Sequence, residues 1–143
     1  MKILEQTALK QAQDLAFKKQ KIFQKSPFRY LLRSMLASMF IGFGVIVAFK
    51  AGNFFYLEQS PFAFPIAALT FGAAIILITY GGGDLFTGNT FYFCYTAFQQ
   101  KISWSDVSRL LLTSYLGNIL GAIFFAFLFS QPDYFPIKEQ LVS

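Results

Sequence analysis

The longest apolar stretch of this sequence is too long to cross a lipid bilayer as one straight helix. It covers residues 62–98 and carries a single charged residue, Asp84. A continuous helix of that length would measure about 55 Å, whereas the hydrocarbon core of a bilayer is about 30 Å thick. Residues 81–90 read Gly-Gly-Gly-Asp-Leu-Phe-Thr-Gly-Asn-Thr, and such residues leave helical geometry readily. We therefore predict a helix that is interrupted over residues 81–90.

This interruption has two interpretations. Irregular backbone at membrane depth persists only where protein buries it or where it lines a cavity, because lipid cannot satisfy its N–H and C=O groups. An interrupted membrane helix is accordingly typical of a transport site. The alternative is a glycine-rich loop that joins two separate short helices at the membrane surface.

The composition indicates an integral membrane protein. Of the 143 residues, 55% are hydrophobic and 13% are charged, about half the charged fraction of soluble domains. The apolar runs are continuous and do not alternate with polar residues, so they predict helices rather than a barrel. We predict an all-α integral membrane protein whose spans cover about residues 30–49, 62–98 (broken) and 110–129.

Positive charge is concentrated before the first span. Eight of the 12 lysines and arginines lie there, against two acidic residues. A basic arm can bind nucleic acid, but beside a membrane span it is the pattern of a cytoplasmic segment. We therefore predict a cytoplasmic N-terminus in a multi-pass protein of the plasma (inner) membrane, without a nucleic-acid partner. The eight are Lys2, Lys10, Lys18, Lys19, Lys21, Lys25, Arg29 and Arg33.

Residues 1–25 are predicted to form an amphipathic basic helix. Apolar residues recur at helical spacing, with lysine and glutamine between them. Such a helix would lie along the cytoplasmic surface or dock on a neighbouring subunit. Ser26-Pro27 is expected to end it. The apolar positions are Ile3, Leu4, Ala8, Leu9, Ala12, Leu15, Ala16 and Ile22.

The first and third spans carry polar and small residues with specific expectations. Arg33 is expected to reach the inner interface. The small residues Ala37, Ser38, Gly42 and Gly44 suit close packing of helices or, alternatively, a pore lining. Residues 50–60 are predicted to form an external loop. Asn118 is a membrane-helix amide that needs a partner, and either Ser103 or Ser105 is expected to cap the third helix.

Some site chemistries are excluded by the composition. The sequence has no histidine and a single cysteine, Cys94. Histidine-based metal sites, histidine acid–base catalysis and an internal disulfide are therefore excluded. We expect no cofactor and no metal, and a transport protein rather than an enzyme.

Four stretches resemble the formate/nitrite transporter family in the same order along the chain. Residues 82–90 resemble the family's central signature, and residues 33–47 its first helix. Residues 102–104 (Ile-Ser-Trp) resemble the entry to its third helix, and residues 115–122 that helix's core. The resemblance implies an aquaporin-like half-repeat of three transmembrane helices, the second broken by a re-entrant loop, in a protein that assembles as a homo-pentamer.

The resemblance also implies roles for individual residues. Those that narrow the pore with apolar side chains would be Phe71, Ile75, Leu85 and Phe86. Those that offer polar groups to the substrate would be Thr87, Gly88, Asn89 and Thr90, with Thr87 facing a central histidine. Those that support the loop structurally would be Asp84 and Asn118.

The chain departs from the family in length. Family members have six spans, and three are predicted here. The central histidine and the cations that attract anions would belong to a complementary C-terminal half, to which an external tail over residues 132–143 would lead. Asp84 would repel an anion if it faced the pore, so we expect it to cap the second half-helix or to pair with a lysine of that half.

The resulting hypothesis is transport of small monovalent anions (formate, nitrite or similar), by a channel or a proton-coupled mechanism. The sequence is also compatible with two other functions. One is a channel for small neutral solutes. The other is a non-transporting membrane assembly subunit, in which the basic arm recruits a soluble partner.

Overall fold

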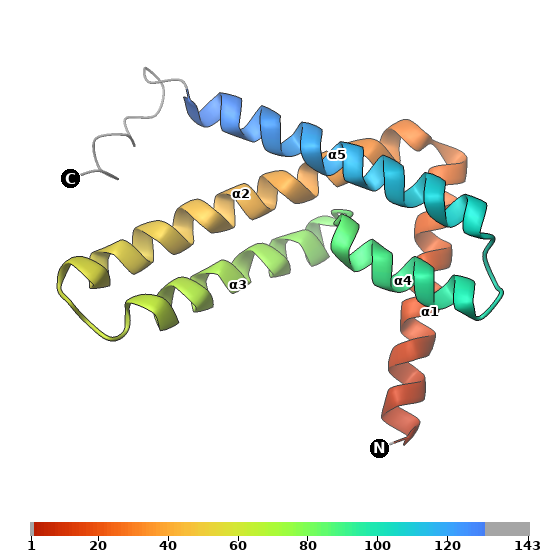
Figure 1. Ribbon diagram of the computed structural model, residues 1–143, viewed down its shortest axis with the longest axis horizontal. Coiled ribbons are helices and arrows are strands. Elements are labelled where there is room, and N and C mark those ends of the chain that lie inside the picture. The colour runs from red at the N-terminus through yellow and green to blue at the C-terminus, as the bar shows by residue number, and fades with distance from the viewer. Residues whose placement is uncertain (1, 131–143) are drawn as a thin grey trace.

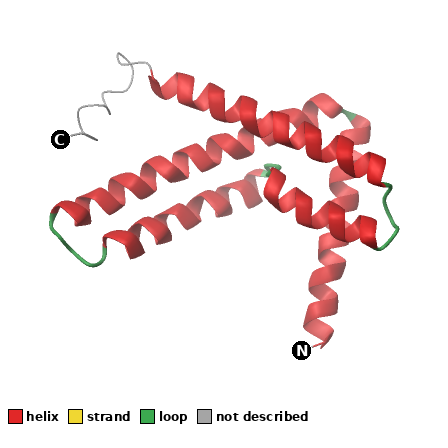
Figure 2. Ribbon diagram, viewed as in Figure 1, coloured by secondary structure: helices red, strands yellow, loops and turns green. Residues whose placement is uncertain are grey.

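The computed structural model describes residues 2–130, and every regular element among them is a helix (Figures 1 and 2). Three helices are long and apolar enough to cross a bilayer, namely α2, α3 and α5. The predicted tail over residues 132–143 lies outside the described residues. The five helices are α1 (Lys2–Lys25), α2 (Pro27–Leu57), α3 (Ala63–Gly81), α4 (Phe86–Phe98) and α5 (Trp104–Ser130).

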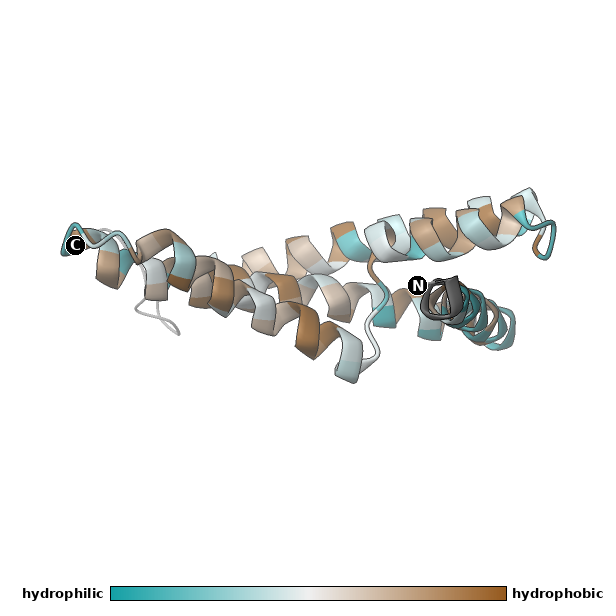
Figure 3. Cartoon of the chain, turned by 90° about the horizontal axis from the view of Figure 1, so that it is seen from below, coloured by the Kyte–Doolittle hydropathy of each residue, from teal (hydrophilic) through white to brown (hydrophobic). Residues whose placement is uncertain are grey.

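The helix α2 packs against both α3 and α5, and α1 lies at a steep angle to them, beside α4 at the end of the molecule where α2 begins (Figure 1). Large apolar side chains are exposed along α2, α3 and α5, including Phe64, Leu69 and Phe127. Figure 3 shows that α1 carries polar residues along much of its length. The apolar outer surface of the three long helices suits lipid or protein surroundings rather than water.

The N-terminal helix docks on this chain itself. It contacts α4 and α2 through its apolar side, where Ala12 and Ala16 are buried. At its end, Ser26 has extended geometry, and its Oγ accepts the N–H of Arg29 at 3.3 Å. Pro27 then takes the first position of α2, where its missing N–H costs nothing. The core beneath α1 comprises Ala16, Tyr30, Phe93, Ala97, Ile102, Val107 and Leu110.

The prediction of a loop over residues 50–60 is wrong for its first eight residues. The helix α2 continues to Leu57, and the turn to α3 occupies only residues 58–62. Packing explains the difference, because the backbone at Gly52 approaches α3 closely. A Cβ added at Gly52 would lie 3.0 Å from the Cβ of Ala67. The polar residues Lys50 and Asn53 are therefore part of the helix.

The helix α5 begins six residues before the predicted span. Ser103 caps it, since the Ser103 Oγ accepts the N–H of Asp106 at 3.1 Å. This observation decides between the two candidate caps. Farther along, Gly117 and Gly121 bring α5 close to α2, where added Cβ atoms would collide with Ser34 and with the backbone of Met35. The third predicted span is thus helical and packs through small residues.

Candidate functional site at the helix interruption

The chain leaves helical geometry where the sequence predicts it, but over four residues rather than ten. Gly82 adopts the left-handed conformation (φ 69°), and the N–H groups of Gly82 and Gly83 both donate to the Ile78 carbonyl. This arrangement ends α3 and gives the Ile78 carbonyl two donors. The expectation of irregular backbone over residues 86–90 is wrong, because α4 already starts at Phe86.

Gly83 brings the interruption against α2. A Cβ at this position would lie 2.9 Å from the Cβ of Ala37 and 3.1 Å from its Cα. The N–H of Asp84 donates to the Arg33 carbonyl at 3.2 Å. Residues 82–85 are therefore fixed on the backbone of α2.

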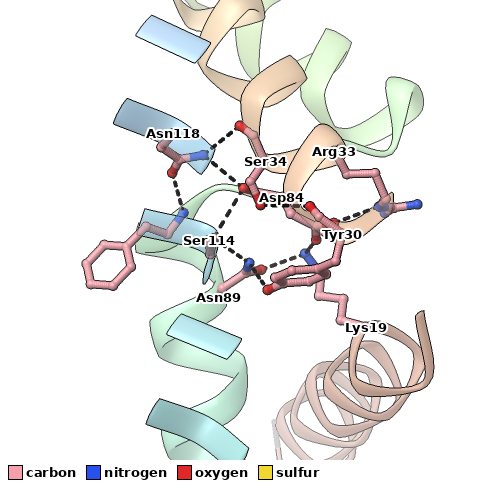
Figure 4. A network of polar contacts seen from close by, with 9 residues as sticks. Lys19, Tyr30, Arg33, Ser34, Asp84, Asn89, Ser114 and Asn118 are labelled. Carbon is pink, nitrogen blue, oxygen red and sulfur yellow. Dashed lines mark hydrogen bonds and ion pairs between the residues drawn. The ribbon is translucent and has the colours of Figure 1, made fainter. Parts of the chain in front are cut away.

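Asp84 is fully buried and holds two cations of this chain (Figure 4). Lys19 Nζ lies 2.5 Å from its Oδ1, and Arg33 Nε lies 2.6 Å from its Oδ2. Asp84 therefore has charged partners on α1 and α2 of this chain, in addition to any that a complementary half would supply. The position of Arg33 relative to the membrane interface stays a prediction.

Asn89 lies beside this ion pair and is also fully buried. Its Nδ2 donates to the Tyr30 hydroxyl at 2.8 Å and to the Ser114 hydroxyl at 3.0 Å. Its Oδ1 accepts from Lys19 Nζ at 2.6 Å. Both amide hydrogens are thus engaged, and the backbone N–H of Asn89 donates to the Leu85 carbonyl at 2.9 Å.

Asn118 joins the three elements that meet at the interruption. Its Oδ1 accepts the N–H of Phe86 at 2.8 Å and so caps α4. Its Nδ2 donates to the Ser34 carbonyl at 2.7 Å and to the Asp84 carbonyl at 3.1 Å. The half-buried amide therefore has the partners that a membrane helix requires, on α2 and at the interruption (Figure 4).

A cavity of about 320 Å³ lies beside the interruption. Of the expected site residues, Ile75, Leu85, Thr87, Gly88 and Asn89 line it. The Thr87 side chain is exposed. The cavity also has three cationic lining residues, Lys18, Lys19 and Arg33, and none of its lining residues is acidic. The interruption thus borders a space that α1, α3, α4 and Arg33 of α2 also line, with apolar walls and positive charge.

Three of the residues expected to narrow the pore or contact the substrate do not line this cavity. Phe71 lies near Gly44 of α2: a Cβ added at Gly44 would be 3.6 Å from Phe71 Cδ2. The Phe86 ring packs edge-on against Tyr115, with ring centroids 5.4 Å apart. Thr90 Oγ1 donates to the Phe86 carbonyl at 2.8 Å, within α4.

Several residues of the polar cluster are not among the site residues that the sequence predicts. Lys19 is one of the lysines of the basic helix, yet it continues the line of the buried Ala12 and Ala16 at helical spacing, and this spacing is the signal that identifies it. No comparable signal singles out the uncharged members Tyr30, Ser34 and Ser114. Within residues 2–130, no three His, Cys, Asp or Glu side chains gather as metal ligands.

Comparison with known proteins decides the family. The sequence profile described as formate/nitrite transporter matches residues 6–142. The chain belongs to the formate/nitrite transporter family. The uncharacterized transporter YwcJ of Bacillus subtilis (strain 168) is 58% identical over 132 residues, which are 92% of this chain and 52% of YwcJ.

More distant members of the formate/nitrite transporter family have named substrates. The nitrite transporter NirC of Escherichia coli (strain K12) is 30% identical over 73% of this chain and 38% of NirC. The formate-nitrite transporter of Plasmodium falciparum (isolate 3D7) is 32% identical over 73% of this chain and 36% of that protein. The chain thus spans about half of YwcJ and less of the other two relatives.

Proposed function

We propose that this chain supplies one half of a pathway by which small monovalent anions, such as formate or nitrite, cross a membrane. The observation that carries the proposal is the position of the interruption along α5. The Asp84 carbonyl accepts hydrogen bonds from Ser114 and Asn118, the eleventh and fifteenth residues of a 27-residue helix. If α5 spans the bilayer, residues 82–85 lie near mid-depth as a re-entrant loop, which supports a transport site rather than a surface turn.

The start of α4 offers hydrogen-bond donors to an anion. The N–H groups of Thr87 and Gly88 find no backbone acceptor within residues 2–130, and a helix N-terminus carries partial positive charge. The Thr87 hydroxyl is exposed beside them. We assign Thr87 and Gly88 to the anion path and Ile75 and Leu85 to its apolar constriction. The polar cluster of Asp84, Asn89 and Asn118 holds them in place.

The rest of the assembly follows from the family. A complementary half would complete an aquaporin-like protomer, and protomers would form a pentamer. We place the N-terminus in the cytoplasm of a cell whose plasma membrane holds the protein. The cations Lys101 and Arg109 lie at the same end of the molecule as α1, since Lys101 Nζ donates to Gln13 at 2.8 Å.

Liposome flux tests this proposal. The chain would be fused to the part of YwcJ that it does not match, and uptake of formate, nitrite and urea would be compared with that of liposomes holding either part alone. We expect formate or nitrite uptake at least about tenfold above both controls, a difference of about 1.4 kcal/mol in activation free energy, and no urea uptake. Urea uptake without anion uptake would favour a neutral-solute channel, and no uptake by a folded fusion would favour an assembly subunit.

A further inference from the structure

Arg33 has hydrogen-bonding capacity that its ion pair does not use. Its Nε donates to Asp84 Oδ2 at 2.6 Å, and its Nη1 and Nη2 donate to no group among residues 2–130. These two nitrogens lie beside Gly82: a Cβ added at Gly82 would be 3.4 Å from Nη1 and 3.5 Å from Nη2. The side chain is 30% exposed and lines the cavity beside the interruption.

The surroundings keep this end of the guanidinium oriented. Asp84 accepts the hydrogen bond of Arg33 Nε from one side. The C-terminal end of α3, capped by Gly82, carries the negative end of that helix's dipole and faces the guanidinium. Lys19 Nζ, the other cation held by Asp84, is already engaged by Asp84 and Asn89. Lys18 is exposed and is not held by an acidic side chain within the described residues. Lys19 thus keeps at most one N–H for a ligand, whereas Arg33 keeps the N–H groups of both Nη1 and Nη2, so that, within the described part of the chain, Arg33 is the oriented cation of the cavity that can offer two parallel donors.

The shape of the unused donors selects a ligand. Two parallel N–H groups of a guanidinium match two oxygens that share a plane and one negative charge, as in formate, acetate or nitrite. A halide ion is a single spherical acceptor and cannot form two parallel hydrogen bonds with the guanidinium. A lysine at this position would give a point charge without the fork.

We propose that Arg33 is a binding residue for planar two-oxygen anions at the α1 side of the interruption. The anion would lie on Nη1 and Nη2 in the cavity, within reach of the Thr87 end of α4, before it enters the apolar constriction. The role of Arg33 in transport rests on the proposed function. The proposal adds to that function a binding residue that lies outside residues 84–90.

The test measures anion binding to the whole chain in detergent micelles, without transport. Binding of ¹³C-formate would be followed by NMR for the unmodified chain and for Arg33→Lys. The matched control is Arg29→Lys, the same substitution one turn earlier on α2, at an exposed position that does not line the cavity. We expect formate affinity to fall about tenfold in Arg33→Lys and to stay within twofold in Arg29→Lys, with chloride affinity changed by less than about threefold in both.

A second measurement covers the case in which Arg33→Lys does not fold. The chain has three arginines, Arg29, Arg33 and Arg109, so their side-chain ¹⁵N resonances can be assigned. Formate should shift the Arg33 Nη resonances of the unmodified chain, and chloride should not. Unchanged Arg33 resonances, or a folded Arg33→Lys chain that binds formate normally, would overturn the proposal.

The two proposals fail separately. If the fusion with YwcJ transports formate while formate leaves the Arg33 resonances unchanged, the transport function stands and the Arg33 assignment is wrong. If the Arg33 resonances respond to formate while the folded fusion transports no anion, the binding site stands and the transport function is wrong.

Discussion

At the scale of single residues, the ion pair between Lys19 and Asp84 decides whether α1 stays in place. Lys19 is the side chain of α1 that reaches the buried carboxylate, and its own side chain is only 12% exposed. Removing one partner of a buried pair leaves charge without full compensation, which costs up to several kcal/mol. Because Arg33 still holds the other oxygen of Asp84, we expect Lys19→Met to lower the free energy of unfolding by about 2 kcal/mol.

The neighbouring lysine provides the control for this prediction. Lys18 is exposed and forms no ion pair with the described residues, so Lys18→Met should change stability by less than about 0.5 kcal/mol. Unfolding in detergent would be followed by circular dichroism, and release of α1 by the rate of tryptic cleavage within residues 2–25. Equal effects of the two substitutions would mean that the Lys19 ion pair does not hold α1.

At the scale of elements, the contact between the interruption and α2 depends on the absence of a side chain at Gly83. A methyl group there would lie 2.9 Å from the Cβ of Ala37 and press against the α2 backbone. Overpacking of this kind typically costs 1–3 kcal/mol. We therefore expect Gly83→Ala to destabilise the protein by about 2 kcal/mol, measured by unfolding in detergent.

The control for Gly83→Ala is the same substitution at Gly72. It lies within α3, and nothing lies within 4 Å of an added Cβ. Alanine is the better helix former, so Gly72→Ala should be neutral or stabilising by up to about 1 kcal/mol. A Gly83→Ala protein as stable as Gly72→Ala would show that residues 82–85 are not held closely on α2.

At the scale of the whole molecule, the sequence predicted the elements better than their connections. Long uncharged runs and a glycine cluster are strong signals, so each predicted span contains a long apolar helix, and the break between α3 and α4 lies within the predicted residues 81–90. The length of α2 was underestimated, because Lys50 and Asn53 resemble loop residues unless the packing of Gly52 on α3 is known.

The candidate site was only partly predictable for a related reason. Asp84 and Asn118 stand out as polar residues in apolar runs, and a need for partners follows directly. Which partners they find depends on how α1 crosses the bundle, and local periodicity carries no information on that crossing. The sequence therefore places Lys19 only among the lysines of the basic helix, whereas the structure pairs it with Asp84.

The central claim, that the interruption lies inside the bilayer, is tested most directly by the depth of a spin label at Thr87. The label would be attached to Thr87→Cys in a Cys94→Ala chain in liposomes, with Glu58→Cys and Gln99→Cys as controls at the two ends of the helices. Depth would be read from collisions with oxygen and with a water-soluble nickel chelate. At a rise of 1.5 Å per residue along α4, we predict a label at residue 87 up to about 18 Å deeper than one at residue 99. Equal interfacial depths for residues 87 and 99 would contradict the account.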